Sequence, residues 1–250
     1  MNGAAILSTQ GLTKSFGGFV ANHDVSVSFP RGKLTAIIGP NGAGKSTFFN
    51  MISGGLKPSY GDILFEGKNV VGVKQHHFAK LGISKSFQIT NLFRDLTVLE
   101  NVRVAVQAIH SRFDLWSARD RHGEWVDQAE ALLRLVGLQD RRRDRADNLA
   151  HGEQRSLEIA VALASDPKLL LLDEPTAGMS PEETRAIMDL ILKLLERRTI
   201  GLVEHKMKLV MGVSDNIIVL HHGELLVQGT PDEIRSNEEV KLVYLGKAQH

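Results

Sequence analysis

A glycine-rich segment near residue 40 has the residue types and the spacing of a loop that binds phosphate. It follows the pattern G-x4-G-K-S. In order, its residues are Gly39, Pro40, Asn41, Gly42, Ala43, Gly44, Lys45 and Ser46, and Thr47 comes next. The glycines let backbone N–H groups close around a triphosphate, and the start of the following helix adds positive potential. We expect Lys45 to reach the β and γ phosphates and Ser46 to offer its hydroxyl to Mg²⁺.

An apolar run that ends in two carboxylates is the second feature with a chemical use. Four leucines at 169–172 precede Asp173 and Glu174. Asp173 is expected to hold Mg²⁺ through a water molecule, and Glu174 to polarise the water that attacks the terminal phosphate. An acidic pair after an apolar run is common, so this interpretation depends on the phosphate-binding loop upstream.

These residues need strands and helices that bring them to one edge of a sheet. Short apolar runs between turn residues predict strands at 5–12, 25–29, 34–38 and 83–88, with a hairpin at 60–73. Later in the chain the pattern predicts a strand at 168–172 that is buried on both faces, a helix at 181–197, a strand at 199–203, and a closing hairpin from 216–220 and 224–228.

The middle of the chain changes to helical periodicity. Thr97 and Glu100 form a predicted capping box before a helix at 102–109. A second apolar stripe, at 126–136, ends at Gly137, which is a helix stop signal, and a further helix is expected at 155–163. The sequence therefore predicts an α/β core into which a helical subdomain is inserted.

Composition narrows the class of protein. The 250 residues carry 30 Lys and Arg against 29 Asp and Glu, a net charge of +1, so bulk charge does not hold a polyanion. The arginines at 141–145 alternate with acidic residues, as on a solvated surface. The absence of cysteine excludes disulfides and thiolate metal sites. With no apparent signal peptide and no apolar stretch long enough to span a membrane, we expect a soluble cytosolic chain.

Several further motifs occur in the order found in the nucleotide-binding subunits of ABC (ATP-binding cassette) transporters, and the sequence resembles this family over nearly its whole length. The resemblance implies a single α/β domain over residues 1–250 with the P-loop NTPase fold of ABC ATPases. This fold has a RecA-like parallel-sheet core, an antiparallel β subdomain and an inserted α-helical subdomain. The core would comprise 1–89 and 167–250, and the helical subdomain 90–166. The resemblance also implies ATP and Mg²⁺ as the bound cofactors.

The resemblance implies roles for three residues outside the first two motifs. Phe16, in KSFGG, matches the aromatic residue that lies against adenine. Gln88, in SFQITNLF, matches the Q-loop glutamine, which touches Mg²⁺ and the attacking water and whose loop faces the membrane subunit. His205, in LVEHKM, matches the switch histidine that contacts the γ-phosphate. With Lys45 and Glu174, Gln88 and His205 would form the catalytic set.

Residues 149–154, LAHGEQ, stand where the family has its signature LSGGQ. In that family two subunits dimerise head to tail, and each signature faces the γ-phosphate bound by the other. Ala150, Gly152 and Glu153 would then lie at the opposite nucleotide. Ala150 lacks the family's serine hydroxyl, and His151 replaces a glycine. Because one neutral hydrogen bond contributes about 0.5–1.5 kcal/mol, we expect a weaker contact between subunits and not a loss of function.

The amino-acid sequences of several segments resemble those of one branch of the family, the larger ATP-binding subunit of branched-chain amino acid importers. These segments are FQITNLFRDLTVLENV, AGMSPEET, VEHKM and the ending GTPDEIRSNEEVKLVYLG. Importers of urea, short amides and aromatic acids share much of these sequences. The lipopolysaccharide-export ATPase shares the VYLG ending but has a different Q-loop region. The resemblance implies a dimer with itself or a paralogue, integral membrane permease subunits and, indirectly, a periplasmic or extracellular solute-binding protein. The chain would lie peripherally on the cytoplasmic face of the membrane and bind no nucleic acid.

Two other classes of protein stay open at this point. A regulatory module would use ATP only as a dimerisation switch, which the intact Glu174 and His205 argue against. A soluble ABC protein acting on DNA or ribosomes usually carries two cassettes or a long coiled coil, and this sequence contains neither.

Overall fold

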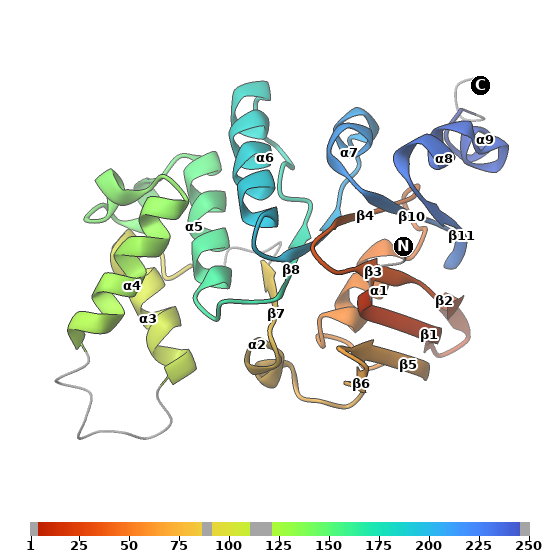
Figure 1. The fold of residues 1–250 in the computed structure, drawn as a ribbon, viewed down its shortest axis with the longest axis horizontal. Helices are drawn as coiled ribbons and strands as arrows, with labels where there is room; N and C mark the ends of the chain where they lie inside the picture. The colour runs from red at the N-terminus through yellow and green to blue at the C-terminus, as the bar shows by residue number, and fades with distance from the viewer. Residues whose placement is uncertain (1–4, 87–91, 111–121, 246–250) are drawn as a thin grey trace.

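The computed structural model describes residues 5–86, 92–110 and 122–245 of the 250-residue chain. Figure 1 shows two β-sheets at one end of the molecule and a group of helices at the other. These helices are α3 (Val98–His110), α4 (His122–Leu135) and α5 (His151–Leu163). No helix in the described ranges is long and apolar enough to cross a membrane.

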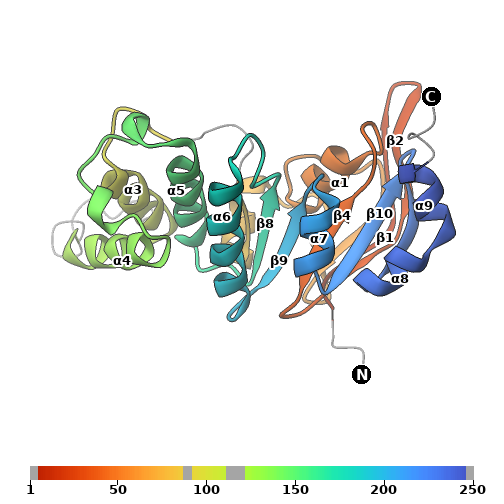
Figure 2. The same cartoon turned by 90° about the horizontal axis from the view of Figure 1, so that it is seen from above.

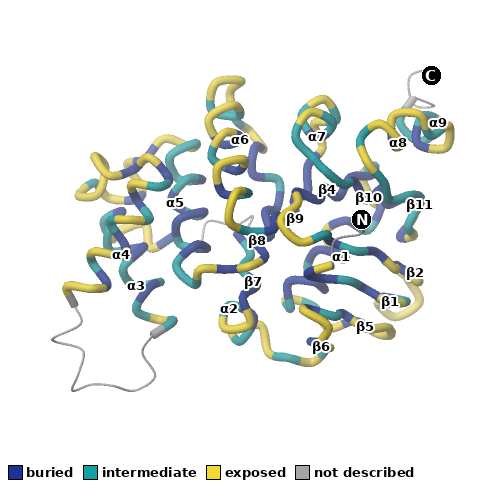
Figure 3. Tube along the Cα trace, viewed as in Figure 1, coloured by how far each residue is buried: buried dark blue, intermediate teal, exposed yellow. Residues whose placement is uncertain are grey.

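The larger sheet has six strands in the order β11-β10-β4-β9-β8-β7. They are β4 (Leu34–Ile38), β7 (Ile83–Ser86), β8 (Leu169–Asp173), β9 (Thr199–Val203), β10 (Asn216–His221) and β11 (Glu224–Gly229). Neighbouring strands pair in parallel, except that β10 and β11 are antiparallel. Every residue of β4, β8 and β9 is buried, as the dark blue strands of Figure 3 show, because both faces of the sheet are covered.

The smaller sheet is antiparallel and has the order β2-β1-β5-β6, with β3 also paired to β1. Its strands are β1 (Ala5–Phe16), β2 (Phe19–Val25), β3 (Ser28–Pro30), β5 (Tyr60–Phe65) and β6 (Lys68–Asn69). Helix α1 (Lys45–Ile52) packs with both sheets, since its buried Phe48 and Phe49 share one cluster with Leu7 of β1 and Leu171 of β8.

Further helices cover the opposite face of the larger sheet, above it in Figure 1 and in front of it in Figure 2. They are α6 (Pro181–Leu195), α7 (Met207–Val213), α8 (Pro231–Ser236) and α9 (Glu238–Leu245). A short helix, α2 (Phe78–Leu81), follows a single 3₁₀ turn at Gln75–His77. Two more such turns, Gln139–Arg141 and Ala146–Asn148, connect α4 to α5.

The helical end has a core that is continuous with the sheet. Val102 of α3, Trp125 of α4 and Leu157 of α5 belong to one buried cluster that extends to Leu170 of β8 and Ile187 of α6. The position of α5 relative to β8 is therefore fixed by apolar packing. The division of the chain at residues 90 and 166 stays a prediction.

Most predicted elements are present, but the predicted strand at 25–29 is wrong. The chain forms β2 and β3 there, with a break between Val25 and Ser28. The second half of the long β1 pairs with β2, and its first half pairs with β3. Pairing with a distant strand, and not the local apolar pattern, sets these boundaries.

The predicted helix boundaries are early or late by a few residues. Helix α3 starts at Val98, directly after Thr97, whose hydroxyl accepts a hydrogen bond from the Glu100 amide at 3.2 Å, as the capping pattern indicated. The helix expected at 126–136 starts earlier, as α4, and ends before Gly137, which has a positive φ of 75°. The helix expected at 155–163 likewise starts earlier, as α5. The strand expected at 83–88 is observed to residue 86, and residues 87 and 88 lie outside the described residues.

Candidate functional site

The glycine-rich loop joins the end of β4 to α1, and its path requires glycine at two positions. A Cβ on Gly39 would lie 2.2 Å from the carbonyl oxygen of Leu220. Gly44 has a φ of 89°, and a Cβ there would lie 2.6 Å from the carbonyl oxygen of Ala21. Side chains are therefore excluded at both positions, so the loop can hold its tight curve and present backbone N–H groups to a phosphate.

A cavity of about 430 Å³ opens over this loop. Its lining residues are Phe19, Ala21, Asn41, Gly42, Ala43, Gly44, Lys45, Ser46, Thr47, Glu174 and His205. The cavity brings together four segments that are far apart in the sequence: strand β2, the loop after β4, the residue after β8, and the loop after β9. Strands β4, β9 and β8 are parallel neighbours, so their carboxyl ends meet at one edge of the sheet.

Lys45 is buried at the loop, with 6% of the residue exposed. Its Nζ donates to the carbonyl oxygens of Gly39 at 2.8 Å and Pro40 at 2.9 Å. Burial lowers the pKa of Lys45, and the charge of Glu174 acts in the opposite direction. A phosphate group would give the ammonium a stronger, charged partner than the two carbonyls.

Glu174 and His205 meet at the wall of the cavity. Asp173 pairs in register with Val203, and the Glu174 amide donates to the Val203 carbonyl at 2.9 Å. Glu174 has a φ of 45°, in the left-handed region that few non-glycine residues adopt. His205 Nε2 lies 2.6 Å from Glu174 Oε1, with 42% and 23% of the two side chains exposed. A carboxylate and an imidazole at this distance can orient a water molecule and accept its proton.

Asp173 is buried at the end of β8 beside a cation that sequence reasoning missed. Its carboxylate lies 3.3 Å from Nζ of Lys85 on β7, which also donates to Asn50 Oδ1 at 2.8 Å. The one signal in the sequence is a lysine in a strand that is expected to be covered by its neighbours.

Ser46 and Asp173 offer oxygen ligands, which Mg²⁺ prefers. Ser46 lines the cavity, and Asp173 directly precedes Glu174, which also lines it. In the described part of the chain, no three His, Asp or Glu side chains form a complete metal site. The two residues therefore fit an ion that substrate phosphates help to bind, as is usual for Mg²⁺.

Of the residues expected from the family resemblance, one is not described and another does not line the cavity. Gln88 lies outside the described residues. Phe16 is exposed, with the Lys14 ammonium 5.0 Å from the centre of its ring, and it is not among the residues that line the cavity. Its cross-strand partner Phe19, at the tip of the same hairpin, does line the cavity. The spacing within KSFGGF does not show which of the two rings, Phe16 or Phe19, lies at the cavity.

The signature segment lies at the start of α5, away from the cavity of its own chain. Ala150, Gly152 and Glu153 are not among the residues that line it. The Glu153 carboxylate accepts from the Ala150 amide at 3.0 Å and pairs with Arg141 at 3.0 Å. The Gly152 amide donates to Glu183 Oε1 at 3.1 Å, a contact that the sequence did not predict.

Arg155 is a second buried cation that sequence reasoning missed. Its guanidinium donates to the backbone carbonyl of Asp173 and pairs with Glu158 at 2.6 Å. Burial raises the pKa of Glu158, and Arg155 acts in the opposite direction. The contact ties the signature helix to the end of β8, where the acidic pair begins.

A glycine-rich loop between a parallel strand and a helix, with an acidic pair on a nearby strand, defines this protein as a P-loop nucleoside triphosphatase. The family model described as ABC transporter matches residues 22–177. The model described as branched-chain amino acid ATP-binding cassette transporter matches residues 224–250. The chain therefore belongs to the ABC transporter family, as an ATP-binding cassette.

Named relatives align over nearly the whole chain. The high-affinity branched-chain amino acid transport ATP-binding protein LivG of Salmonella typhimurium is 41% identical over 252 residues, covering 97% of this chain and 98% of that protein. BraF of Pseudomonas aeruginosa, named in the same way, is 39% identical over 251 residues, again with 97% and 98% coverage.

Solved structures share the fold. A nucleotide-free ATP-binding cassette from an ABC transporter is similar with a TM-score of 0.85 and 30% identity, covering 96% of this chain and 99% of that one. The ADP conformation of the cassette MJ1267 has the same TM-score and identity, with 97% and 99% coverage. The family, the ABC ATPase fold and the binding of ATP that the sequence indicated are thereby confirmed.

Proposed function

We propose that this chain hydrolyses ATP to power a membrane importer of branched-chain or other hydrophobic amino acids, or of related amides. The observation that carries the proposal is the 2.6 Å contact between His205 and Glu174 at a cavity whose floor is the phosphate-binding loop. LivG and BraF, which are named as branched-chain amino acid transport ATP-binding proteins, support the class of cargo.

The residues of one chain divide the chemistry between them. The loop amides and Lys45 bind the β and γ phosphates, with Lys45 exchanging its two carbonyl partners for phosphate oxygens. Ser46 and Asp173 would hold Mg²⁺, which neutralises phosphate charge when bound, and the family resemblance adds Gln88 to this set. Glu174 orients a water molecule and accepts its proton as the water oxygen attacks the γ-phosphorus. The bond to the ADP oxygen breaks, and ADP leaves with that electron pair.

His205 has two tasks in this scheme. Its bond to Glu174 fixes the direction of the carboxylate. It also faces the cavity, where the family resemblance implies a contact with the γ-phosphate. Loss of that phosphate on hydrolysis would therefore remove a contact from the loop that carries His205.

Two copies of the site form in a head-to-tail dimer of this chain with itself or with a paralogue. The signature segment does not line the cavity of its own chain, which leaves it free to approach the nucleotide of a partner. A dimeric ABC transporter cassette, MJ0796, is similar with a TM-score of 0.76 and 26% identity over 90% of this chain, which supports a dimer.

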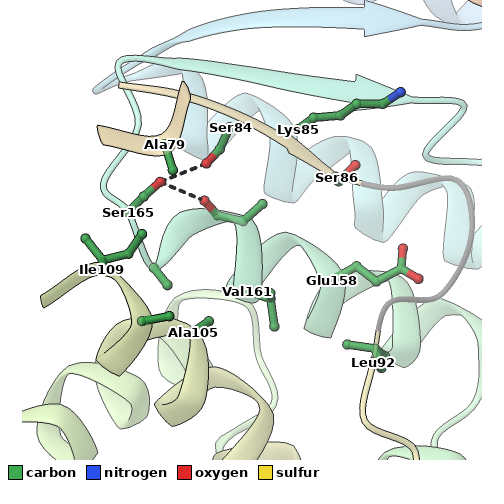
Figure 4. Close-up of a pocket in the computed structure, with 13 residues that line it drawn as sticks. Ala79, Ser84, Lys85, Ser86, Leu92, Ala105, Ile109, Glu158, Val161 and Ser165 are labelled. Atoms are coloured by element: carbon green, nitrogen blue, oxygen red, sulfur yellow. Dashed lines mark hydrogen bonds between the residues drawn. The ribbon is translucent and has the colours of Figure 1, made fainter. Parts of the chain in front are cut away.

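A second cavity, of about 260 Å³, offers a place for the membrane subunit. It lies between β7, α3 and α5, as Figure 4 shows. Ile109 and Val161 are part of its apolar wall, and the Ser86 hydroxyl is buried without a partner among the described residues. Phe93, directly after the lining residue Leu92, is 56% exposed. An apolar hollow with one unpaired hydroxyl suits a short amphipathic helix of the permease.

These partners set the location of the chain. Docked to permease subunits, it lies on the cytoplasmic face of the membrane, and a solute-binding protein delivers the cargo on the other side. The transported solute does not touch this chain, so importers of urea, short amides or aromatic acids are the alternative within the same branch.

The test is the assembled transporter. The chain should co-purify with its permease subunits, and leucine uptake into vesicles should require internal ATP and stop in a Glu174→Gln variant. ATP turnover without any membrane partner would favour a regulatory ATPase instead. Uptake of urea or an amide in place of leucine would keep the motor function and change the cargo.

A further inference from the structure

Glu204 follows β9 and directly precedes His205, and its side chain is almost completely buried, with 3% of the residue exposed. Its two carboxylate oxygens bind two different segments. Oε1 accepts hydrogen bonds from the amide of Thr176, at 3.3 Å, and from the Thr176 hydroxyl. Oε2 accepts from the amides of His205 at 3.0 Å and Lys206 at 3.4 Å. One carboxylate thus joins the loop that follows Glu174 to the loop that carries His205.

Every polar group of Thr176 makes a hydrogen bond. Glu204 binds its amide and its hydroxyl, and Nζ of Lys206 donates to its carbonyl oxygen at 3.0 Å. Lys206 also donates to the Thr184 hydroxyl at 3.1 Å, which extends the contact to α6. The two residues that flank His205 in the sequence therefore bind the residue two positions beyond Glu174.

The side chains of Glu174 and His205 are not held in place by burial. Both are partly exposed at the cavity, and Glu174 has the unusual φ of 45°. Exposed side chains keep a fixed distance only when the backbone segments that carry them are held in place. Beyond the last β8–β9 contact, where the Glu174 amide bonds the Val203 carbonyl, the cluster of Glu204, Thr176 and Lys206 holds these two loops together.

We propose that Glu204 is a positioning residue for ATP hydrolysis, which sets the geometry of Glu174 and His205 by joining their two loops. The inference rests on the proposed function, because it concerns the same hydrolytic site. Glu204 is buried and does not line the cavity, so it acts through the backbones of Thr176 and His205.

A glutamine at position 204 does not replace the carboxylate. Three of the four groups that face Glu204 are backbone amides, and in this arrangement all four donate. A carboxylate accepts at both oxygens, whereas an amide side chain has one accepting oxygen and one donating nitrogen. In either orientation, glutamine would turn its N–H group towards the donors of one loop and release that loop.

The test is Glu204→Gln in the full-length chain assembled with its permease. We expect turnover at saturating ATP to fall about tenfold to a hundredfold, since an error of about 1 Å in the placement of a catalytic group costs this much. The Kd for ATP, measured by calorimetry, should stay within about twofold of wild type, because the phosphate-binding loop and Lys45 are untouched.

Two further variants separate positioning from general damage. Asp215→Asn is the matched control, because Asp215 also accepts from a backbone amide, that of Leu34 at 2.9 Å, but at the opposite end of β4. It should lower thermal stability and leave turnover at saturating ATP unchanged. Thr176→Val removes only the hydroxyl donor and should lower turnover in the same direction by a smaller factor. It provides the same test in case Glu204→Gln does not fold.

A double-mutant cycle identifies the route of the effect. In a His205→Ala chain, measured in single-turnover experiments with labelled ATP, adding Glu204→Gln should change the rate by less than about twofold, since residues that act as a unit are not additive. The inference is wrong if Glu204→Gln leaves turnover unchanged, if turnover, ATP affinity and stability fall together, or if the full loss recurs in the His205→Ala chain. The proposed function fails separately, if the wild-type complex does not turn over ATP.

Discussion

The ammonium group of Lys85 lies 3.3 Å from the carboxylate of Asp173, with only 11% and 4% of the two side chains exposed. The pair joins β7 to β8, the strand that ends in the acidic pair. The same ammonium lies 4.9 Å from the centre of the Phe49 ring on α1. A buried carboxylate needs a partner of opposite charge, so Lys85 stabilises the residue that we propose as a Mg²⁺ ligand.

Removal of this partner should destabilise the fold. Lys85→Met keeps the length and the apolar stem of the side chain but removes the charge, and leaves the Asp173 carboxylate buried without an ionic partner. We expect the free energy of unfolding in urea to fall by about 3–5 kcal/mol, the usual cost of breaking a buried pair from one side.

Lys33→Met is the control for this experiment. Lys33 pairs with Asp215 at 2.8 Å, but its side chain is 54% exposed. An exposed pair contributes little, so the urea midpoint of the control should not change measurably. A Lys85→Met protein as stable as the control would contradict a stabilising role of the buried pair.

Glu174→Gln should separate ATP binding from ATP hydrolysis. Glutamine keeps the size of the side chain but does not accept a proton, so turnover should fall by about 10²–10⁴-fold. The Kd for ATP should stay close to wild type, because Lys45 and the loop amides hold the phosphates. Glu182→Gln, at an exposed position on α6, serves as the control and should keep full turnover. Undiminished hydrolysis in Glu174→Gln would place the general base elsewhere.

Ala150→Ser should strengthen the start of α5 and the contact between subunits. Ala150 occupies the N-cap with extended dihedral angles, φ −61° and ψ 158°, but has no side-chain acceptor, so only half of a capping box exists there. A complete box is present at α6, where Ser180 and Glu183 bond each other at 3.2 Å and 2.9 Å. Serine at position 150 should add about 0.5–1 kcal/mol to stability.

The same hydroxyl should also bind the γ-phosphate of the partner chain's ATP. ATP-dependent dimerisation, measured by light scattering in the Glu174→Gln background, should need roughly 2–10-fold less ATP in the Ala150→Ser chain, as expected for one hydrogen bond. Higher thermal stability with unchanged dimerisation would limit the serine to a capping role.

The chemistry of the site could be predicted where it depends on short, local patterns. The loop at 39–46, the pair Asp173 and Glu174, and His205 lie at the ends of parallel strands, so one sheet edge brings them together. The contacts that support them could not be predicted in this way. Lys85 with Asp173, and Arg155 with the Asp173 carbonyl, join segments whose separation depends on how the helical end packs against the sheet.

The fold shows the same division between local and distant determinants. Apolar runs with full burial on both faces, such as β4 and β8, were predicted within a residue or two of their observed bounds. The strands β2 and β3 were not, because each is defined by the half of β1 that it pairs with. Phe16 and Phe19 face each other across that hairpin, so only the structure shows which ring lines the cavity.

The stability of α5 should depend on pH through Glu153. Its hydrogen bond with Arg141, followed by the one from the Ala150 amide, holds the pKa of Glu153 below its ordinary value of 4.5. A carboxyl with a lower pKa in the folded state adds stability above the unfolded-state pKa, and this contribution is lost as the pH falls through the folded-state pKa.

Glu153→Gln tests this dependence. At neutral pH the variant should be less stable than wild type by about 0.2–1 kcal/mol, the usual range for an exposed ion pair, because the glutamine oxygen can still accept from the Ala150 amide and only the pair with Arg141 is lost. The difference should shrink towards zero in urea unfolding at a pH well below 4.5. An equal difference at both pH values would mean that the charge of Glu153 does not contribute.

Glu183 should compete with ATP for the signature segment. Gly152 belongs to the signature segment, which our proposal brings to the nucleotide of the partner chain, and its amide donates in this structure to Glu183 Oε1 at 3.1 Å. The carboxylate must leave before the phosphate can bind, and an amide side chain is a weaker acceptor than a carboxylate. Glu183→Gln should therefore lower the ATP concentration needed for dimerisation in the Glu174→Gln background, whereas Glu182→Gln should not. A higher requirement for ATP would show instead that Glu183 holds α5 and α6 in the orientation that dimerisation needs.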